Sequence, residues 1–258
     1  MIVTLVKVKA VGGKMKVFNR FGDQRLKSYA EYNRAETCHC IYCGEVATTR
    51  EHVPSKVFLD KPYPENLPVL PACFDCNNGY SVDETYVASF IEKLARLVMS
   101  DYVPRDKVDT ILNHDKKLAT ALDGNINIID NDQISYRLQS DAFDKVLQKL
   151  AKGHAVYEMD EVFYEFDDMQ SNYKFCVELT QEELDLFNEP AILECFPEVG
   201  SRMLNRVIEG YDNNNRLRTG WVIVQEGRYR YMTYLYNNSI VVRIVINEFL
   251  YAEVHWGQ

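Results

Sequence analysis

The sequence predicts an α+β fold, and three observations carry that prediction. An amphipathic helix is expected from Ser81, because Ser81 and Glu84 match a capping box and apolar residues then recur at helical spacing as far as Val98. Two pairs of cysteines, each spaced as CxxC, frame the segment before this helix. Four β-rich runs joined by short polar turns predict an antiparallel meander, at residues 220–226, 228–236, 239–246 and 250–256.

The remaining elements are predicted from local patterns. Residues 1–18 alternate apolar and basic side chains, which predicts a strand hairpin turning at Gly12 and Gly13. An amphipathic helix is expected from Ser140 and is expected to end at Gly153. Further strands are predicted at 125–130, 134–138 and 173–179, and short helices at 23–37 and 180–188.

These elements suggest three regions. Residues 1–37 would form N-terminal strands and a connector, and residues 38–100 a zinc module with the helix that follows it. Residues 101–258 would form an α+β domain that contains the meander and carries no motif of assigned function.

Composition and charge limit the class of protein. The chain has 258 residues, 47% of them hydrophobic and 12% aromatic, which is enough to form real cores and argues against disorder. No apolar run is long enough for a membrane helix, and the N-terminus lacks the pattern of a signal peptide, so we expect a cytoplasmic protein without a membrane partner. The net charge is −9, yet the first 58 residues contain ten Lys or Arg and only five Asp or Glu. Nucleic acid would be attracted to this first part, although its lysines could equally form the wet face of a strand pair.

The two CxxC pairs predict a structural zinc site formed by Cys40, Cys43, Cys73 and Cys76. Each short turn directs two thiolates at one point, and two turns complete a tetrahedral shell. The alternatives are disulfides or inert buried thiols, which suit a reducing compartment less well than metal does. The other cysteines are expected to be ordinary thiols, although Cys38 is close enough to Cys40 to be a rival ligand.

Glu51 and His52 stand side by side between the two pairs, and this arrangement suggests chemistry beyond a structural zinc. A treble-clef module places a β-hairpin and then a helix around its metal, and the segment from Cys40 to Tyr80 has the length for it. We therefore expect His52 and Asn77 to converge beside the zinc, with Glu51 next to them. The other histidines, His39, His114, His154 and His255, have no such surroundings and are expected to be structural.

The residues between and around the cysteines resemble the HNH, or ββα-metal, endonucleases. The resemblance rests on CIYC, EHVP, PENL and CFDCN, and it is closest to the four-cysteine subgroup with asparagine as the third signature residue. It implies His52 as the general base, and Glu51 and Asn77 as ligands of one catalytic Mg²⁺ or Mn²⁺. It also implies that Asn66 fastens the loop that holds His52. Arg50 and Lys56 are expected, from their positions, to contact substrate phosphate.

The resemblance implies a nucleic-acid partner, with DNA as the expected substrate, and a bacterial or phage setting. The acidic second domain would suit control by a regulatory protein partner or autoinhibition, and the β-rich C-terminal end would suit either a homo-oligomer or an ordinary core. Two other functions stay open. The zinc module could bind nucleic acid without cutting it, or it could stabilise a domain that only interacts with proteins.

Overall fold

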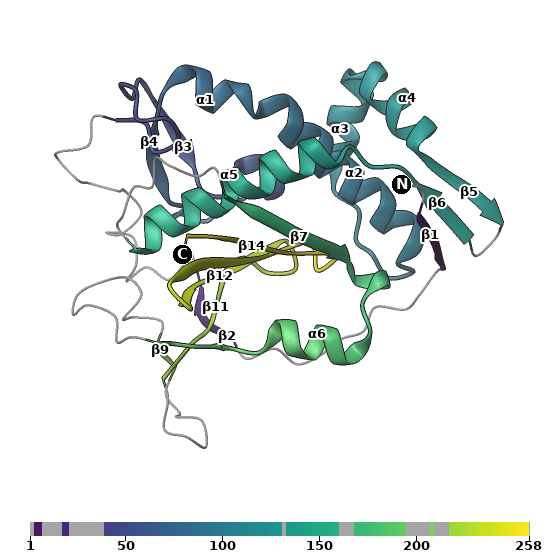
Figure 1. Ribbon diagram of the computed structural model, residues 1–258. Helices are drawn as coiled ribbons and strands as arrows, with labels where there is room; N and C mark the ends of the chain where they lie inside the picture. The colour runs from purple at the N-terminus through teal and green to yellow at the C-terminus, as the bar shows by residue number, and fades with distance from the viewer. Residues whose placement is uncertain are drawn as a thin grey trace.

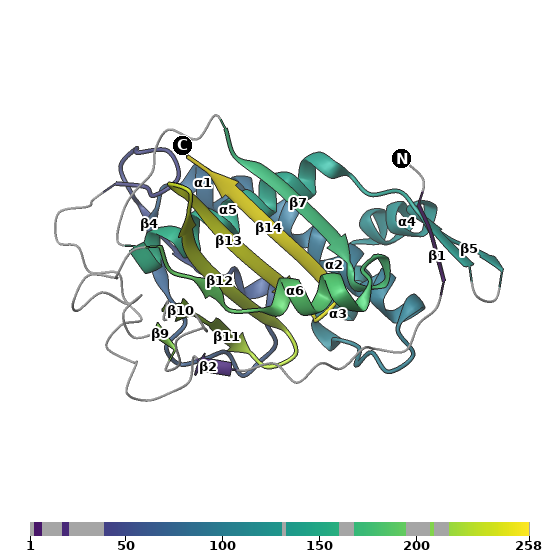
Figure 2. The ribbon, with the colours of Figure 1, turned by 60° about the horizontal axis from the view of Figure 1, so that its bottom comes forward.

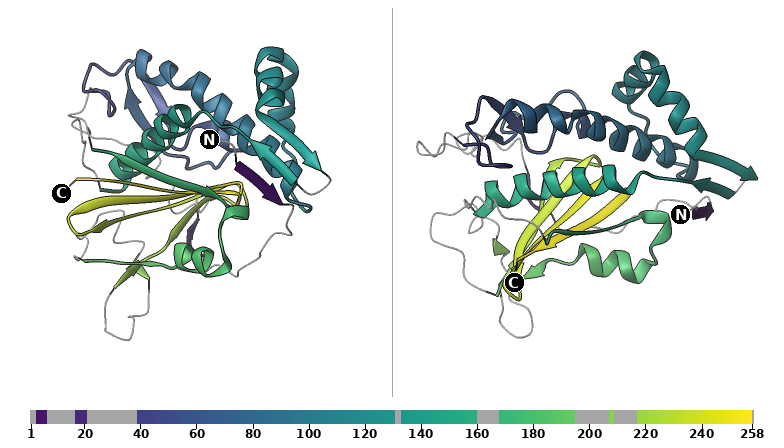
Figure 3. Two further views of the ribbon diagram at one scale, coloured as in Figure 1. Left: turned by 45° about the vertical axis from the view of Figure 1, so that its right-hand side comes forward. Right: turned by 45° about the horizontal axis from the view of Figure 1, so that its top comes forward.

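The computed structural model describes residues 3–6, 17–20, 39–130, 133–159, 168–194, 207–208 and 217–257 (Figure 1). It is built in layers around one sheet. Helix α5 (Ser140–Met159) lies on one face of this sheet, and α2 (Ser81–Val98) packs on the outer side of α5. Helix α6 (Gln181–Asn188) lies on the opposite face, as the edge-on views show (Figure 3). The α+β class predicted from the sequence is confirmed.

The main sheet has six strands in the order β2-β11-β12-β13-β14-β7 (Figure 2). Four of them form the meander, and their antiparallel pairing confirms that prediction. Asn237 and Asn238, both at positive φ, make the tight turn between β12 and β13. The strands are β2 (Val17–Arg20), β7 (Gln170–Phe175), β11 (Trp221–Gln225), β12 (Tyr229–Tyr236), β13 (Ser239–Ile246) and β14 (Leu250–Trp256).

Both faces of the sheet are covered, which explains why its strands are almost continuously apolar. On one face Tyr231 and Val242 join the core beneath α5. On the other face Trp221 and Val241 pack with Leu184 of α6 in a separate cluster. The predicted helix at 180–188 is confirmed as α6, and its cap is a reciprocal pair of hydrogen bonds between Thr180 and Glu183.

Two predictions about the long helices are wrong in detail. Helix α2 begins at Ser81 as expected, but its cap is Tyr80, and the Ser81 hydroxyl donates to the carbonyl of Asn78 instead of closing a capping box. Helix α5 does not end at Gly153 but continues to Met159. A side chain at Gly153 would place Cβ 3.0 Å from both methyl groups of Val53, so the glycine lets α5 pack closely against Val53.

The N-terminal strands form, but the predicted hairpin between them is wrong. Strand β1 (Val3–Val6) pairs with β6 (Gln133–Tyr136), which also pairs with β5 (Ile126–Asp130), whereas β2 runs parallel to β11 in the main sheet. The helix expected at 23–37 lies outside the described residues.

Helices α3 (Asp106–His114) and α4 (Lys116–Asn125) were not predicted. The remaining short elements are β8 (Ala191–Ile192), β9 (Val207–Ile208), β10 (Arg218–Thr219) and the 3₁₀ turns η2 (Lys56–Phe58) and η3 (Cys176–Glu178).

The cysteine-framed segment folds as a small hairpin followed by a helix. Strands β3 (Thr49–His52) and β4 (Val69–Ala72) are antiparallel, and α1 (Phe74–Gly79) comes directly after Cys73. A single apolar cluster extends from Phe58 through α2 and α5 to the main sheet, so it includes residues on both sides of position 100. The division into three regions stays a prediction. No helix of the described part of the chain is both long and apolar enough to span a membrane.

We predict that Gly153→Ala lowers the free energy of unfolding, because the new methyl group would press on Val53 at 3.0 Å and such overpacking costs about 1–3 kcal/mol. Gly124→Ala in α4 is the matched control, since no atom lies within 4 Å of the Cβ that it would add. The control keeps or raises stability through the helix propensity of alanine. Urea unfolding of both variants measures the difference, and equal stabilisation by both would contradict close packing at Gly153.

Candidate metal centre and the residues around it

The four predicted cysteines come together in one cluster. The sulfur atoms of Cys40, Cys43, Cys73 and Cys76 all lie within 4.8 Å of one another, and those of Cys43 and Cys73 are 3.7 Å apart. Four thiolates around a tetrahedral zinc stand about 3.8 Å apart. All four are free cysteines, so the disulfide alternative is not realised among the described residues. The cluster can therefore hold a metal ion such as zinc.

Hydrogen bonds from the backbone help to direct the two sulfur atoms of each CxxC turn toward one point. The backbone N–H of Tyr42 donates to the sulfur of Cys40 at 3.4 Å, and the N–H of Cys76 donates to the sulfur of Cys73 at 3.3 Å. Gly44, at a φ of 80°, allows the first turn to close, with its N–H on the carbonyl of Cys40. Cys73 is at the same time the N-cap of α1. The hydrogen bond from Cys76 lowers the pKa of the Cys73 thiol, which favours the thiolate that binds metal.

Asn77 fastens helix α1 to strand β3. Its side-chain amide donates to the hydroxyl of Thr49 at 3.0 Å and to the backbone carbonyl of Arg50 at 3.3 Å. The residue after the last cysteine therefore contacts the strand that carries Glu51 and His52. Asn77 and Glu51 therefore belong to one structural unit, because the Asn77 amide binds the backbone carbonyl of the residue directly before Glu51.

The Glu51 carboxylate is directed into the protein. The side chain is buried, at 5% exposure, and its Oε1 accepts hydrogen bonds from Lys149 at 3.0 Å and from Ser55 at 3.1 Å. Glu84 of α2 accepts hydrogen bonds from the same two groups. Lys149 of α5, at 2% exposure, lies 5.4 Å from the centre of the Tyr80 ring. Burial raises the pKa of Glu51, and Lys149 opposes that rise.

This ion-pair cluster bears on the predicted catalytic cation. A site for Mg²⁺ or Mn²⁺ needs carboxylate and carbonyl oxygens that no other cation occupies. Glu51 already accepts from an ammonium group, and that positive charge would repel a divalent ion placed beside it. The contacts described do not fit a divalent-ion site formed by Glu51 and Asn77.

His52 lies on the other side of the strand from Glu51. Successive residues of a strand point to opposite faces, so Thr49 and Glu51 share one face of β3 while Arg50 and His52 share the other. The imidazole is half-buried, and burial and then the positive charge of Lys56 lower its pKa. His52 is therefore neutral at neutral pH. Glu51 and His52 are neighbours in sequence that face different surroundings.

The other predicted residues lie around this hairpin. Arg50 is exposed, and Lys56 opens the short turn η2 that follows the hairpin strand. Asn66 is buried, at 1% exposure, in a turn closed by the N–H of Leu67 on the carbonyl of Pro64. That loop contacts the residue after His52, because the N–H of Val53 donates to the carbonyl of Pro68. The orienting role of Asn66 stays a prediction.

Sequence reasoning missed Ser55, Glu84 and Lys149. Glu84 matches the pattern of a capping box, and this local pattern hides its contact with Lys149, a residue 65 positions away. Lys149 did leave a signal, since it falls between Val146 and Gly153 on the face of α5 that is otherwise apolar or small. A charged residue on such a face is rarely buried without a partner.

No family model matches the chain, and neither a curated protein nor a solved structure matches it.

We predict that the purified protein contains about one zinc ion per chain, as expected for a closed four-thiolate shell. Cys76→Ser removes one ligand and lowers the zinc content, whereas Cys176→Ser, a half-buried free cysteine outside the cluster, leaves it unchanged. Elemental analysis by mass spectrometry measures both. Equal zinc in the two variants would exclude the cluster as the site.

We predict that Lys149→Met lowers the free energy of unfolding by about 3–5 kcal/mol, because two buried carboxylates lose their ammonium partner. Lys145→Met, one turn earlier and exposed, is the control and changes it by about 0.5 kcal/mol or less. Urea unfolding compares the two. A Lys149 variant as stable as the control would contradict the cluster.

Proposed function

We propose that the chain is a nuclease of the HNH, or ββα-metal, type, which hydrolyses phosphodiester bonds of nucleic acid, with DNA as the expected substrate. The observation that carries the proposal is the arrangement around β3. Hairpin, helix and four sulfur atoms form one unit, and Asn77, next to the last cysteine, holds the backbone directly before Glu51 and His52. This arrangement supports a treble-clef module as its framework.

His52 would act as the general base. A base must be unprotonated and reachable, and His52 is a half-exposed, neutral imidazole at the end of a strand held at both ends. Arg50 lies on the same face of β3, and Lys56 is near enough to act on the imidazole. We assign to these two side chains the binding of the attacked phosphate and part of the compensation of its developing charge.

The remaining residues of the module would have positioning roles. Four thiolates leave a zinc ion no open position for water, so the metal would hold β3 and α1 and take no part in hydrolysis. Glu51 would stabilise β3 from its buried side through Lys149 and Ser55. Glu51 would thus stabilise β3 from one face, while His52 would act as the base on the other face.

A second candidate function is a zinc-stabilised module that binds nucleic acid or another protein without catalysis. The ion pair between Glu51 and Lys149 favours it, because a carboxylate used internally is not needed for a catalytic ion. A nucleic-acid-binding module predicts salt-sensitive binding of nucleic acid without cleavage in any divalent metal, and a protein-interaction module predicts neither binding nor cleavage of nucleic acid.

We predict that the purified chain nicks supercoiled plasmid DNA and that His52→Ala abolishes nicking, because the attacking water then lacks its base. The zinc content and melting temperature of the variant stay near those of the wild type. His114→Ala, an exposed histidine of α3, is the control and retains nicking. Reactions with Mg²⁺, with Mn²⁺ and with a chelator determine whether a divalent ion is needed. Equal nicking by wild type and His52→Ala would refute the role of His52.

A further inference from the structure

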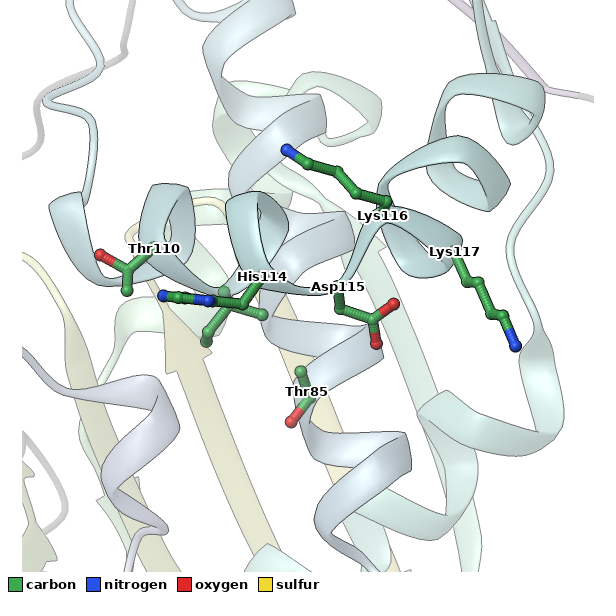
Figure 4. A pocket seen from close by; sticks show the side chains of 7 residues that line it. Thr85, Thr110, His114, Asp115, Lys116 and Lys117 are labelled. Atoms are coloured by element: carbon green, nitrogen blue, oxygen red, sulfur yellow. The ribbon is translucent and has the colours of Figure 1, made fainter.

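A cleft of about 620 Å³ lies between the segment 60–63 and the first turns of α3. A second hollow of about 630 Å³ lies between α2, α3 and α4 and shares Thr110 and Ile111 with it. In Figure 4 the ammonium groups of Lys116 and Lys117 at that second hollow point in different directions. None of its lining residues is buried, so it has the character of an open surface depression. The first cleft differs because it contains a buried cationic side chain.

That side chain is Arg105, the N-cap residue of α3. Its guanidinium is fully buried, with Nε donating to Asp60 at 2.8 Å and Nη2 to the carbonyl of Val57 at 2.9 Å. Its Nη1 has no hydrogen-bond acceptor among the residues that the structure describes. A buried donor without an acceptor is costly. Arg105 therefore adds a fixed positive charge to the wall of the cleft next to a helix N-terminus, and both features favour a phosphate group.

The rim of the cleft combines an aromatic ring with cationic groups. The ammonium nitrogens of Lys56 and Lys107 lie 5.3 Å and 5.2 Å from the centre of the Tyr63 ring. Lys107 also donates to the Tyr63 hydroxyl at 3.1 Å, so the ring is held in place. Lys61 lines the cleft and is exposed. A fixed ring beside ammonium groups is the usual platform for one base and its phosphate in single-stranded nucleic acid.

The acidic groups of the cleft are largely neutralised. Asp60 is paired both with Arg105 and, at 2.7 Å, with Arg228 of the turn between β11 and β12. Asp106 stands in the first turn of α3 and is the remaining acid of the lining. With Arg105 already paired to Asp60, two cations of the lining, Lys61 and Lys107, face one acid, Asp106. The balance favours an anionic ligand.

The cleft adjoins the proposed catalytic histidine through Lys56. This lysine follows His52 by four positions, and it lies against the same Tyr63 ring that lines the cleft. We propose that the cleft binds the nucleotide next to the cleaved bond, with its base on Tyr63 and its phosphate at Lys61 and the N-terminus of α3. The choice of ligand rests on the proposed function. The site itself rests on the cleft and its charges.

The test measures binding of a fluorescein-labelled single-stranded DNA oligonucleotide by anisotropy, over a range of salt concentrations. The full chain carries His52→Ala so that the probe is not cut. Lys61→Glu weakens binding and lowers the slope of log affinity against log salt by about 1 or more. Tyr63→Leu weakens it by about fivefold or more. Lys145→Glu, an equal charge change at an exposed position of α5, leaves both quantities near the parent values.

Each outcome decides one point. Unchanged affinity of the Lys61→Glu protein overturns the site, and because Lys61 is exposed the result does not depend on how Tyr63→Leu folds. Displacement of the probe by AMP as effectively as by unlabelled oligonucleotide, at equal phosphate, marks a free-nucleotide site and overturns the strand proposal. If the wild-type chain binds the probe through Lys61 but nicks no plasmid, the binding site in the cleft stands and the proposed nuclease activity is refuted.

Discussion

The ammonium group of Lys149 connects three elements that are far apart in sequence. It lies between the carboxylates of Glu51 on β3 and Glu84 on α2, and the Ser55 hydroxyl lies within hydrogen-bond distance of both carboxylates. Buried charges are tolerated only when they are paired and hydrogen-bonded, so none of these groups can shift alone without a large cost. The cluster therefore fixes the register of the hairpin against both long helices. The cysteine cluster closes the hairpin from its other end.

Helix α5 extends this constraint to the rest of the molecule because its two sides contact different partners. Lys149 and Gly153 lie toward the hairpin module, and the missing side chain at Gly153 lets Val53 approach closely. His154 instead lies on the sheet, stacked on Tyr231 at 3.6 Å, with its Nε2 2.7 Å from the hydroxyl of Tyr229. Helix α5 thus connects the meander to the module that carries His52, and Asp60 adds a direct contact through its salt bridge with Arg228.

Local patterns were enough to predict the cysteine cluster, the meander and helices α2 and α6, because each depends on contacts between residues close in sequence or on a repeating apolar pattern. The failures have one physical cause. Glu84 and Gly153 matched local rules for a cap and a helix end, yet their roles are set by Lys149 and Val53, which are distant along the chain. The partners of β1 and β2 were likewise undetermined, since an alternating strand says nothing of which sheet it joins.

The adjacency of Glu51 and His52 shows how strand geometry divides a motif. In a loop, two neighbouring side chains can converge on one ion, but on β3 they must point to opposite faces. The buried face of β3 places the carboxylate against Lys149, and the other face leaves the imidazole half-exposed beside Lys56. A residue that contributes stability and one that is free for chemistry can then occupy consecutive positions without competing. For both to share one cation, the end of β3 would have to twist away from the pairing of His52 with Val69, and Lys149 would have to release Glu51.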